Sequence, residues 1–256
     1  MLPVYNEEGA LDSLFAKFTS VSRTITYKLR FVAVDDGSSD RSVCRLENWG
    51  KKFPIEIIRN EVNRGLGYTI RRGLAHAAAG ADAGDTVITM DADNTHPPEL
   101  IAPMISRLNA GCDVAIASRY QPSSRVIGLS GFRQTMSHGA RILFQLLIGV
   151  PGVRDYTCGY RAYRVEMLRR ALPEFSGCLS SEHGFACTAE ILLRCPSLEA
   201  RIEEVPLELR YDLKGSASKM DVRTTACRLL RLAWKNRRLM SARNGRRGWW
   251  SVISPA

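Results

Sequence analysis

The sequence predicts an α/β fold, in which a mostly parallel sheet carries helices on both faces. Short runs of β-branched residues alternate with helical patterns through the first half of the chain, and this alternation is typical of βαβ units. Polar stretches follow where those runs end, and the carboxyl ends of strands are where open α/β sheets bind ligands. With 256 residues, the chain can form one large domain around a sizeable core.

The chain opens with MLPVYNEEG, which resembles a strand end followed by a helix start, with no strand before it. A shortened first strand and a short irregular N-terminus are both compatible with this pattern. Further strands are expected in LRFVAVDD (29–36), IEIIRN (55–60), TVITMDAD (86–93) and DVAIAS (113–118), with helices near 40–51, 66–79 and from 98 onward. Pro97, Pro98 and Glu99 favour a helix start, because proline loses nothing in the first turn and an acid suits the positive helix end.

The second half of the chain is expected to be richer in helix. A largely apolar stretch punctuated by arginines, FRQTMSHGARILFQLLIGV (132–150), predicts an amphipathic helix. A second amphipathic helix is predicted in CRLLRLAWKNRRL (227–239), close to the C-terminus.

Composition excludes a disordered chain, because 45% of the residues are hydrophobic and 24% are charged. A net charge of +10 predicts an anionic partner, such as a phosphate, a nucleotide or a membrane surface. Nucleic acid is not favoured, since the basic residues are spread along the chain without a recognition motif. Seven cysteines without a CxxC pair suggest neither a disulfide framework nor a zinc site. With no membrane-length apolar stretch and no signal peptide, a cytoplasmic protein is expected.

Four polar stretches fall at predicted strand ends and are expected to converge at one edge of the sheet. They are residues 6–8, DDGSSD (35–40), NEVNRGLG (60–67) and DADNTH (91–96). Asp91 and Asp93 are expected on the same side of an extended segment, because side chains alternate. Two carboxylates on one side repel each other unless a cation lies between them, so the pair predicts Mg²⁺ or Mn²⁺. A turn without metal is the alternative, because Asp-x-Asp also occurs in turns.

The stretch NRGLG allows a close backbone approach at Gly65 and Gly67, followed by a helix whose N-terminus could face a phosphate. It matches neither the GxxxxGK[ST] pattern nor the GxGxxG pattern. This argues against a P-loop ATPase and against a dinucleotide-binding dehydrogenase.

Seven motifs occur in the order seen in GT-A glycosyltransferases of family 2. They are LPVYNEEGAL, VDDGSSD, NRGLGYTIRRGLAHA, MDADNTHPPEL, ASRY, RDYTCGYRAYR and EVPLELRYDLKGSASKM. The chain most resembles the branch of polyprenyl-phosphate (dolichyl-phosphate) mannosyltransferases and glucosyltransferases. The resemblance implies a GT-A catalytic domain over residues 1–220, followed by a basic amphipathic C-terminal helix and tail over 221–256.

The resemblance also assigns expected roles on the donor side of the site. Donor-binding positions, which hold the base, ribose and phosphates of a nucleotide sugar, are Pro3, Tyr5, Glu7, Asp36, Gly65 and Asp91. Asp91 and Asp93 match the metal-binding pair, and Asp93 with Arg119 would be central to catalysis. Mannosyltransferases commonly carry a Gln two residues after the second Asp, where this chain has Thr95 as a possible third ligand.

On the acceptor side, Arg119 matches an arginine that contacts phosphate, and Arg133 is a second candidate or an interfacial cation. Asp155, Arg161 and Glu190 are expected to shape the sugar and acceptor pocket, although a buried Asp155–Arg161 pair that merely fixes the loop is the alternative. The resemblance implies a loop that closes over phosphates and contains Lys214, Ser218 and Lys219. A simply solvated loop is the alternative.

The implied reaction is an inverting transfer of a hexose to a polyprenyl monophosphate, from GDP-mannose or, next, UDP-glucose, with Mg²⁺ or Mn²⁺. An acceptor that is already anionic needs positioning and no general base, so His96 and His138 are expected to be structural. The helix over 132–150 is expected either to rest in lipid headgroups, placing the enzyme peripherally at the cytosolic face of a membrane, or to pack on the sheet. Alternatives are a GT-A transferase with a soluble phosphorylated acceptor and a nucleotide-sugar-binding domain without activity.

Overall fold

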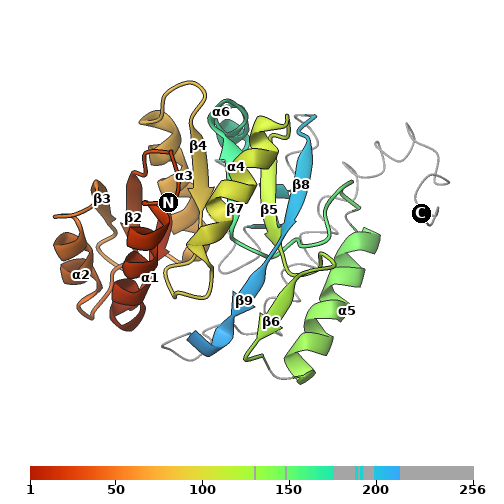
Figure 1. Ribbon diagram of the computed structural model, residues 1–256, viewed down its shortest axis with the longest axis horizontal. Coiled ribbons are helices and arrows are strands. Elements are labelled where there is room, and N and C mark those ends of the chain that lie inside the picture. The colour runs from red at the N-terminus through yellow and green to blue at the C-terminus, as the bar shows by residue number, and fades with distance from the viewer. Residues whose placement is uncertain (130, 148, 176–187, 190, 193–198, 214–256) are drawn as a thin grey trace.

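The computed structural model describes residues 1–129, 131–147, 149–175, 188–189, 191–192 and 199–213. Its centre consists of a three-stranded set in the order β3-β2-β1 and a four-stranded set in the order β4-β7-β5-β8 (Figure 1). The strands are β1 (Leu2–Val4), β2 (Phe31–Asp35), β3 (Ile55–Arg59), β4 (Thr86–Thr89), β5 (Val114–Ser118), β7 (Arg161–Arg164) and β8 (Ile202–Pro206).

Two sets of strands join through the first residue of the chain. The Met1 amino group donates a hydrogen bond to the Ile88 carbonyl oxygen at 2.6 Å, and the Met90 N–H donates to the Met1 carbonyl oxygen at 3.2 Å. This pattern is that of a parallel pair, so β4 runs parallel to β1. Strand β7 is antiparallel to both of its neighbours, β4 and β5, whereas β5 and β8 are parallel. The sheet is therefore mixed and mostly parallel, as predicted.

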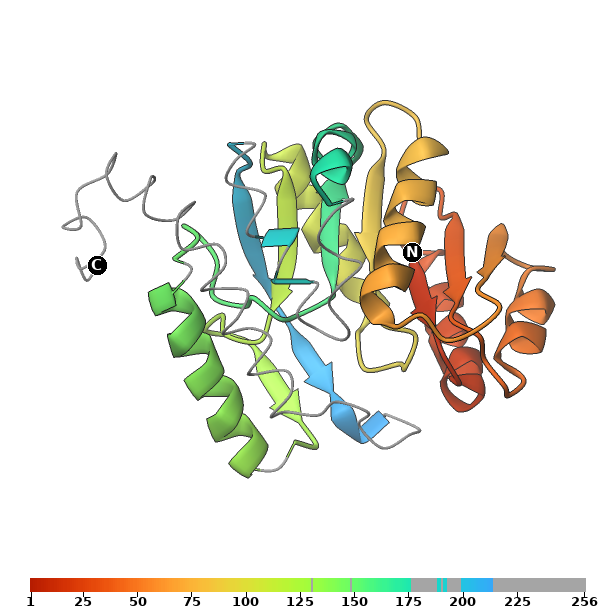
Figure 2. The ribbon, with the colours of Figure 1, turned by 180° about the vertical axis from the view of Figure 1, so that it is seen from behind.

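Helices cover both faces of the sheet, which confirms that prediction. The helices are α1 (Glu8–Val21), α2 (Ser42–Trp49), α3 (Leu66–Ala79), α4 (Ile101–Asn109), α5 (Gly131–Leu147) and α6 (Val165–Phe175). Figures 1 and 2 show α1 and α4 on one face and α3 with α6 on the other. Strands β2 and β5 are buried along their whole length between these layers. Helix α5 stands apart from the sheet, beside the short strand β6 (Arg125–Ile127).

Some elements agree with the expectation, the short first strand among them, and others differ from it. The opening residues form a true but short strand, β1, because three residues pair in register with β2. Strands β7 and β8 were not anticipated, nor was the small parallel pair of β6 with β9 (Glu208–Arg210). The helix expected over 132–150 is confirmed as α5. The predicted C-terminal helix and tail lie outside the described residues, and none of the described helices is long and apolar enough to cross a membrane.

Candidate active site

The carboxyl ends of β1, β2, β4 and β5 lie along one edge of the sheet, together with the loop that leads into β7. The β1–α1 and β2–α2 connections interlock there. The backbone N–H of Asn6 donates to the Ser38 hydroxyl at 3.0 Å, and the Asn6 side-chain oxygen accepts from the Ser39 N–H at 2.9 Å. The Glu7 N–H donates to the Ser42 hydroxyl at 2.8 Å. The polar stretches that follow β1 and β2 thus form one connected surface, with Tyr5 exposed on it.

Asp36, which follows β2, binds the connection between β3 and α3. Its buried carboxylate accepts the Asn60 side-chain amide at 2.7 Å, the Arg64 N–H at 2.8 Å and the Gly65 N–H at 2.9 Å. Gly65 has φ 87°, a conformation that side chains with a Cβ rarely adopt, so glycine is favoured at this bend. Asp36, expected to contact a nucleotide, therefore also holds the loop that carries Gly65.

The carboxylates of Asp91 and Asp93 lie just beyond β4. Because the strand ends at Thr89, the alternation expected to place both on one side does not apply, and residues 92–94 form bends instead. Asp93 is buried, and its Oδ1 accepts both the N–H (3.2 Å) and the hydroxyl (2.7 Å) of Thr95. Asp91 is partly exposed, and its N–H donates to Nδ1 of the buried His96 at 3.2 Å. His96 thus supports the acidic loop from inside, as its expected structural role requires.

The donor set on this loop fits a hard divalent cation. Within the described part of the chain, no three acidic, His or Cys side chains are assembled as a metal site. The loop does, however, contain Asn94, whose buried side-chain oxygen has no hydrogen-bond partner among the described residues. Mg²⁺ and Mn²⁺ prefer oxygen ligands, and Mg²⁺ commonly binds one or two carboxylates together with substrate phosphates. Two carboxylates and an unsatisfied amide oxygen meet that requirement.

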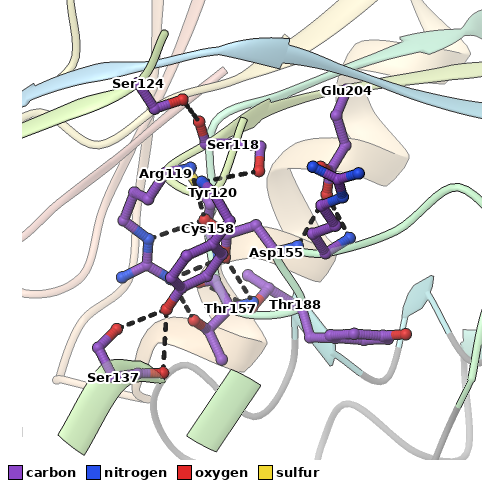
Figure 3. Close-up of polar contacts among 12 residues, drawn as sticks. Ser118, Arg119, Tyr120, Ser124, Ser137, Asp155, Thr157, Cys158, Thr188 and Glu204 are labelled. Atoms are coloured by element: carbon purple, nitrogen blue, oxygen red, sulfur yellow. Dashed lines mark hydrogen bonds and ion pairs between the residues drawn. The ribbon is translucent and has the colours of Figure 1, made fainter. Parts of the chain in front are cut away.

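Arg119 and Asp155 form a buried ion pair beyond β5 (Figure 3). Arg119 Nε donates to Asp155 Oδ2 at 2.8 Å, and Nη2 donates to Oδ1 at 2.7 Å and to the Thr157 hydroxyl at 2.6 Å. Burial by itself raises the pKa of the Asp155 carboxyl, but the charge and hydrogen bonds of Arg119 outweigh burial and hold that pKa below its usual value. Both groups are therefore charged at neutral pH.

Glu204 of β8 supports the same loop from the other side. Its Oε1 accepts the backbone N–H groups of Arg154 (2.6 Å) and Asp155 (2.7 Å), and its Oε2 accepts the Gln121 side-chain amide at 2.9 Å. Figure 3 shows Glu204 pointing toward the backbone next to Asp155, while the Asp155 side chain faces Arg119. The loop is held by charged groups on both sides.

The order of these features matches a known family. The family model described as "Glycosyl transferase family 2" matches residues 1–172, more than half of the chain. The chain belongs to glycosyltransferase family 2. This confirms the family inferred from the seven sequence motifs.

The chain is similar in sequence to two curated family 2 proteins. The chain is 29% identical over 218 residues to a dolichol-phosphate mannosyltransferase of Pyrococcus furiosus, covering 85% of this chain and 57% of that protein. It is 33% identical over 168 residues to an undecaprenyl-phosphate 4-deoxy-4-formamido-L-arabinose transferase of Pseudomonas fluorescens, covering 64% of this chain and 46% of that protein. The chain therefore spans about half the length of these relatives.

A solved structure confirms the GT-A fold. Glucosyl-3-phosphoglycerate synthase from Mycobacterium tuberculosis, crystallised with Mn²⁺, UDP and glucosyl-3-phosphoglycerate, superposes with a TM-score of 0.62 at 19% identity. The match covers 91% of this chain and 77% of that one. At this identity the likeness concerns the fold alone.

The remaining predicted residues fall into three groups. Arg161 is fully buried and donates to the carbonyl oxygens of Thr188 and Tyr156, so the ion pair considered between Asp155 and Arg161 is wrong; Asp155 pairs with Arg119. Arg133 lies in α5, and its side chain is outside the description. Glu190, Lys214, Ser218 and Lys219 lie outside the described residues.

Sequence reasoning missed the residues that hold the Asp155 loop and helix α5. Glu204 is the first residue of the motif EVPLELRY and lies in β8, where the sequence shows only an ordinary strand pattern. Tyr120 directly follows Arg119 and bonds to α5 through the Ser137 hydroxyl at 2.6 Å. The Tyr120 ring also packs edge-on against His138. Both contacts join segments distant in sequence, so no local pattern could reveal them.

Proposed function

We propose that this chain transfers a hexose from a nucleotide diphosphate sugar to a polyprenyl monophosphate with inversion, with mannose from GDP-mannose favoured and glucose from UDP-glucose next. The main support for this proposal is the position of the Asp91–Asp93 loop. It lies at the sheet edge, between the β3–α3 connection that Asp36 binds and the Arg119–Asp155 pair. Both relatives described above are named for a polyprenyl-phosphate acceptor and differ in the sugar. The acceptor class therefore has more support than the sugar.

Asp91, Asp93 and Asn94 would hold the Mg²⁺ or Mn²⁺ ion. When bound, the cation neutralises the charge that develops on the leaving diphosphate. Thr95, considered as a third ligand, instead donates its hydroxyl proton to Asp93 and orients that carboxylate. Asn94 takes its place in the proposal, because its buried oxygen is unsatisfied among the described residues.

The chain's own residues position the two reactants on either side of this loop. Tyr5, Glu7 and the Asp36-held loop with Gly65 would receive the nucleotide at the ends of β1, β2 and β3. Arg119, held rigidly by Asp155 on its Nε side, would present its remaining guanidinium face toward phosphate. A lipid monophosphate is already anionic at neutral pH, so its oxygen can attack without a general base. Attack opposite the leaving group would convert an α-linked donor into a β-linked product.

Helix α5 supports a peripheral membrane location. Ile142 is 56% exposed and Leu146 is 79% exposed, and their four-residue spacing places them on one side of the helix. Arg141 lies next to them and stacks over the Tyr120 ring at 4.9 Å, which connects this helix to the strand end carrying Arg119. Exposed aliphatic residues beside a cation suit the boundary between headgroups and acyl chains. We propose that α5 brings the site to the lipid acceptor.

Transfer of radiolabelled sugar tests the function. GDP-mannose and UDP-glucose are each incubated with a short polyprenyl phosphate, with Mn²⁺ or with EDTA, and label is counted in the organic phase. We expect metal-dependent label with the wild-type protein and none with Asp93→Ala. Asp82→Ala should transfer label like wild type, since Asp82 is exposed at the opposite edge of the sheet. Label transferred only to a soluble phosphorylated acceptor would contradict the lipid assignment. Donor binding without any transfer would contradict catalysis itself.

A further inference from the structure

Glu204 gathers two consecutive backbone donors on a single oxygen. The N–H groups of Arg154 and Asp155 both reach its Oε1, at 2.6 and 2.7 Å. Asp155 is fully buried, so its N–H needs a partner within the protein, and an unpaired one would carry a desolvation cost. A carboxylate oxygen can accept both bonds at once, and charge makes each of them stronger. Glu204 therefore fixes the backbone at the start of the loop.

Asp155 passes this constraint on through its side chain. Its Oδ1 accepts the backbone N–H groups of Thr157 (3.2 Å) and Cys158 (3.0 Å) as well as Arg119 Nη2. Its Oδ2 accepts both the backbone N–H and the Nε of Arg119. The path of the chain from residue 154 to residue 158 is thus set by two acids in series, Glu204 on the backbone and Asp155 within the loop (Figure 3).

The next two residues of the loop, Gly159 and Tyr160, pack beside Asp91 and its partner His96. At Gly159 a Cβ atom would lie 3.4 Å from Asp91 Oδ1, so the loop backbone is in van der Waals range of that carboxylate. The Tyr160 ring stacks on His96, with ring centres 5.1 Å apart, and His96 accepts the Asp91 N–H. Movement of residues 154–160 would therefore change the space available to Asp91.

We propose that Glu204 is a positioning residue for the Asp91 site, acting through the loop of residues 154–160. The proposal rests on the proposed function, because it assumes that Asp91 holds a divalent cation. Glu203, its neighbour in β8, points to the opposite side of the sheet and forms ion pairs with Arg107 and Arg201. It therefore provides a matched control on the same strand.

Four variants separate positioning from a general loss of stability. Glu204→Ala removes both acceptor oxygens, whereas Glu204→Gln keeps an oxygen for the two N–H groups. Glu203→Ala is the matched acid control, and Val205→Ala removes buried volume from the same strand on the face opposite Glu204. Each variant is characterised by its melting temperature, its Mn²⁺ dissociation constant from the electron paramagnetic resonance of free Mn²⁺, kcat and KM for sugar transfer, and hydrogen exchange of residues 154–160.

We expect Glu204→Ala to weaken Mn²⁺ binding and lower kcat on the order of 10-fold, as is typical for partners of metal ligands. Exchange in the loop should increase, and Glu204→Gln should restore most of the binding. Both control variants should keep wild-type Mn²⁺ affinity and kcat, although Val205→Ala should melt at a lower temperature. Wild-type Mn²⁺ affinity and kcat in a folded Glu204→Ala variant would overturn the proposal, as would an equal loss in Val205→Ala. A wild-type protein that neither binds Mn²⁺ nor transfers sugar would instead overturn the proposed function.

Discussion

Replacing Asp155 by Asn isolates the charge of the buried pair, because the two side chains have nearly the same shape. Three donors meet Oδ1 and two meet Oδ2, the backbone N–H and the Nε of Arg119. The side-chain oxygen of Asn can accept either the donors at Oδ1 or those at Oδ2. Its NH₂ group then faces the other set of donors, to which it cannot hydrogen-bond. Arg119, only 15% exposed in its side chain, would remain charged without a carboxylate. Breaking a buried ion pair in this way costs about 3–5 kcal/mol.

Urea unfolding at pH 7 followed by fluorescence measures this cost. The control is Asp212→Asn, because Asp212 also binds an arginine, Arg210, through two carboxylate oxygens, but at the surface. Solvent screens that pair, so its loss is expected to change stability far less. A loss below about 1 kcal/mol for Asp155→Asn, or equal losses for the two variants, would refute the reasoning, because burial is what distinguishes the pairs.

The same pair predicts a pH dependence. The folded-state pKa of Asp155 lies below its usual value, since Arg119 outweighs the opposing effect of burial. The unfolded chain takes up this proton near pH 3.9, so the stabilisation is complete above that pH and is lost as pH falls through the lower folded-state value. The difference in unfolding free energy between wild type and Asp155→Asn should therefore stay constant from pH 7 to about 5 and shrink below about 4. A difference that persists unchanged into acid would assign the loss to shape instead of charge.

Three further predictions follow from other parts of the molecule. Gly65→Ala places a Cβ at φ 87° and should destabilise the protein by about 1–3 kcal/mol in thermal unfolding. At pH 7.5, iodoacetamide with peptide mapping should modify exposed Cys44 well before Cys158, because burial raises the pKa of the Cys158 thiol to about 12. Combined Ile142→Ser and Leu146→Ser should reduce sedimentation with anionic liposomes while melting temperature is unchanged, since both side chains are exposed.

The parts of the fold that depend on local patterns could be predicted from the sequence. The helix expected over residues 66–79 forms as α3 with the same bounds, and the strand at Val114–Ser118 lies within the predicted run. Strand β7 escaped prediction because its sequence, RAYR, is four residues long and has no alternating pattern. Its burial comes from insertion between β4 and β5, which are distant in the chain.

The site divides in the same way. The positions of Asp36 and Asp91 at strand ends follow from the alternation of strands and helices. The partner of Asp155 does not, because Arg119 is 36 residues away and Arg161, only six residues away, was the nearer candidate. Topology decides between them: Arg161 begins β7 and is directed into the core, whereas Arg119 leaves β5 at the edge where the loop passes.

Two buried aspartates at the edge of the sheet have a structural role that differs from the role proposed for Asp91. Asp36 and Asp155 are buried and accept three and five hydrogen bonds, most of them from segments distant in the chain, so their charge is used to hold neighbouring loops together. Asp91 remains partly exposed beside the Gly159 backbone. Neutralising a carboxylate that shapes a loop lowers the stability of the folded protein. Neutralising a carboxylate that binds a cation mainly weakens binding of that cation. The two buried acids thus stabilise the loops on either side of the aspartates proposed to bind metal, and the sequence pattern alone makes all of them look equivalent.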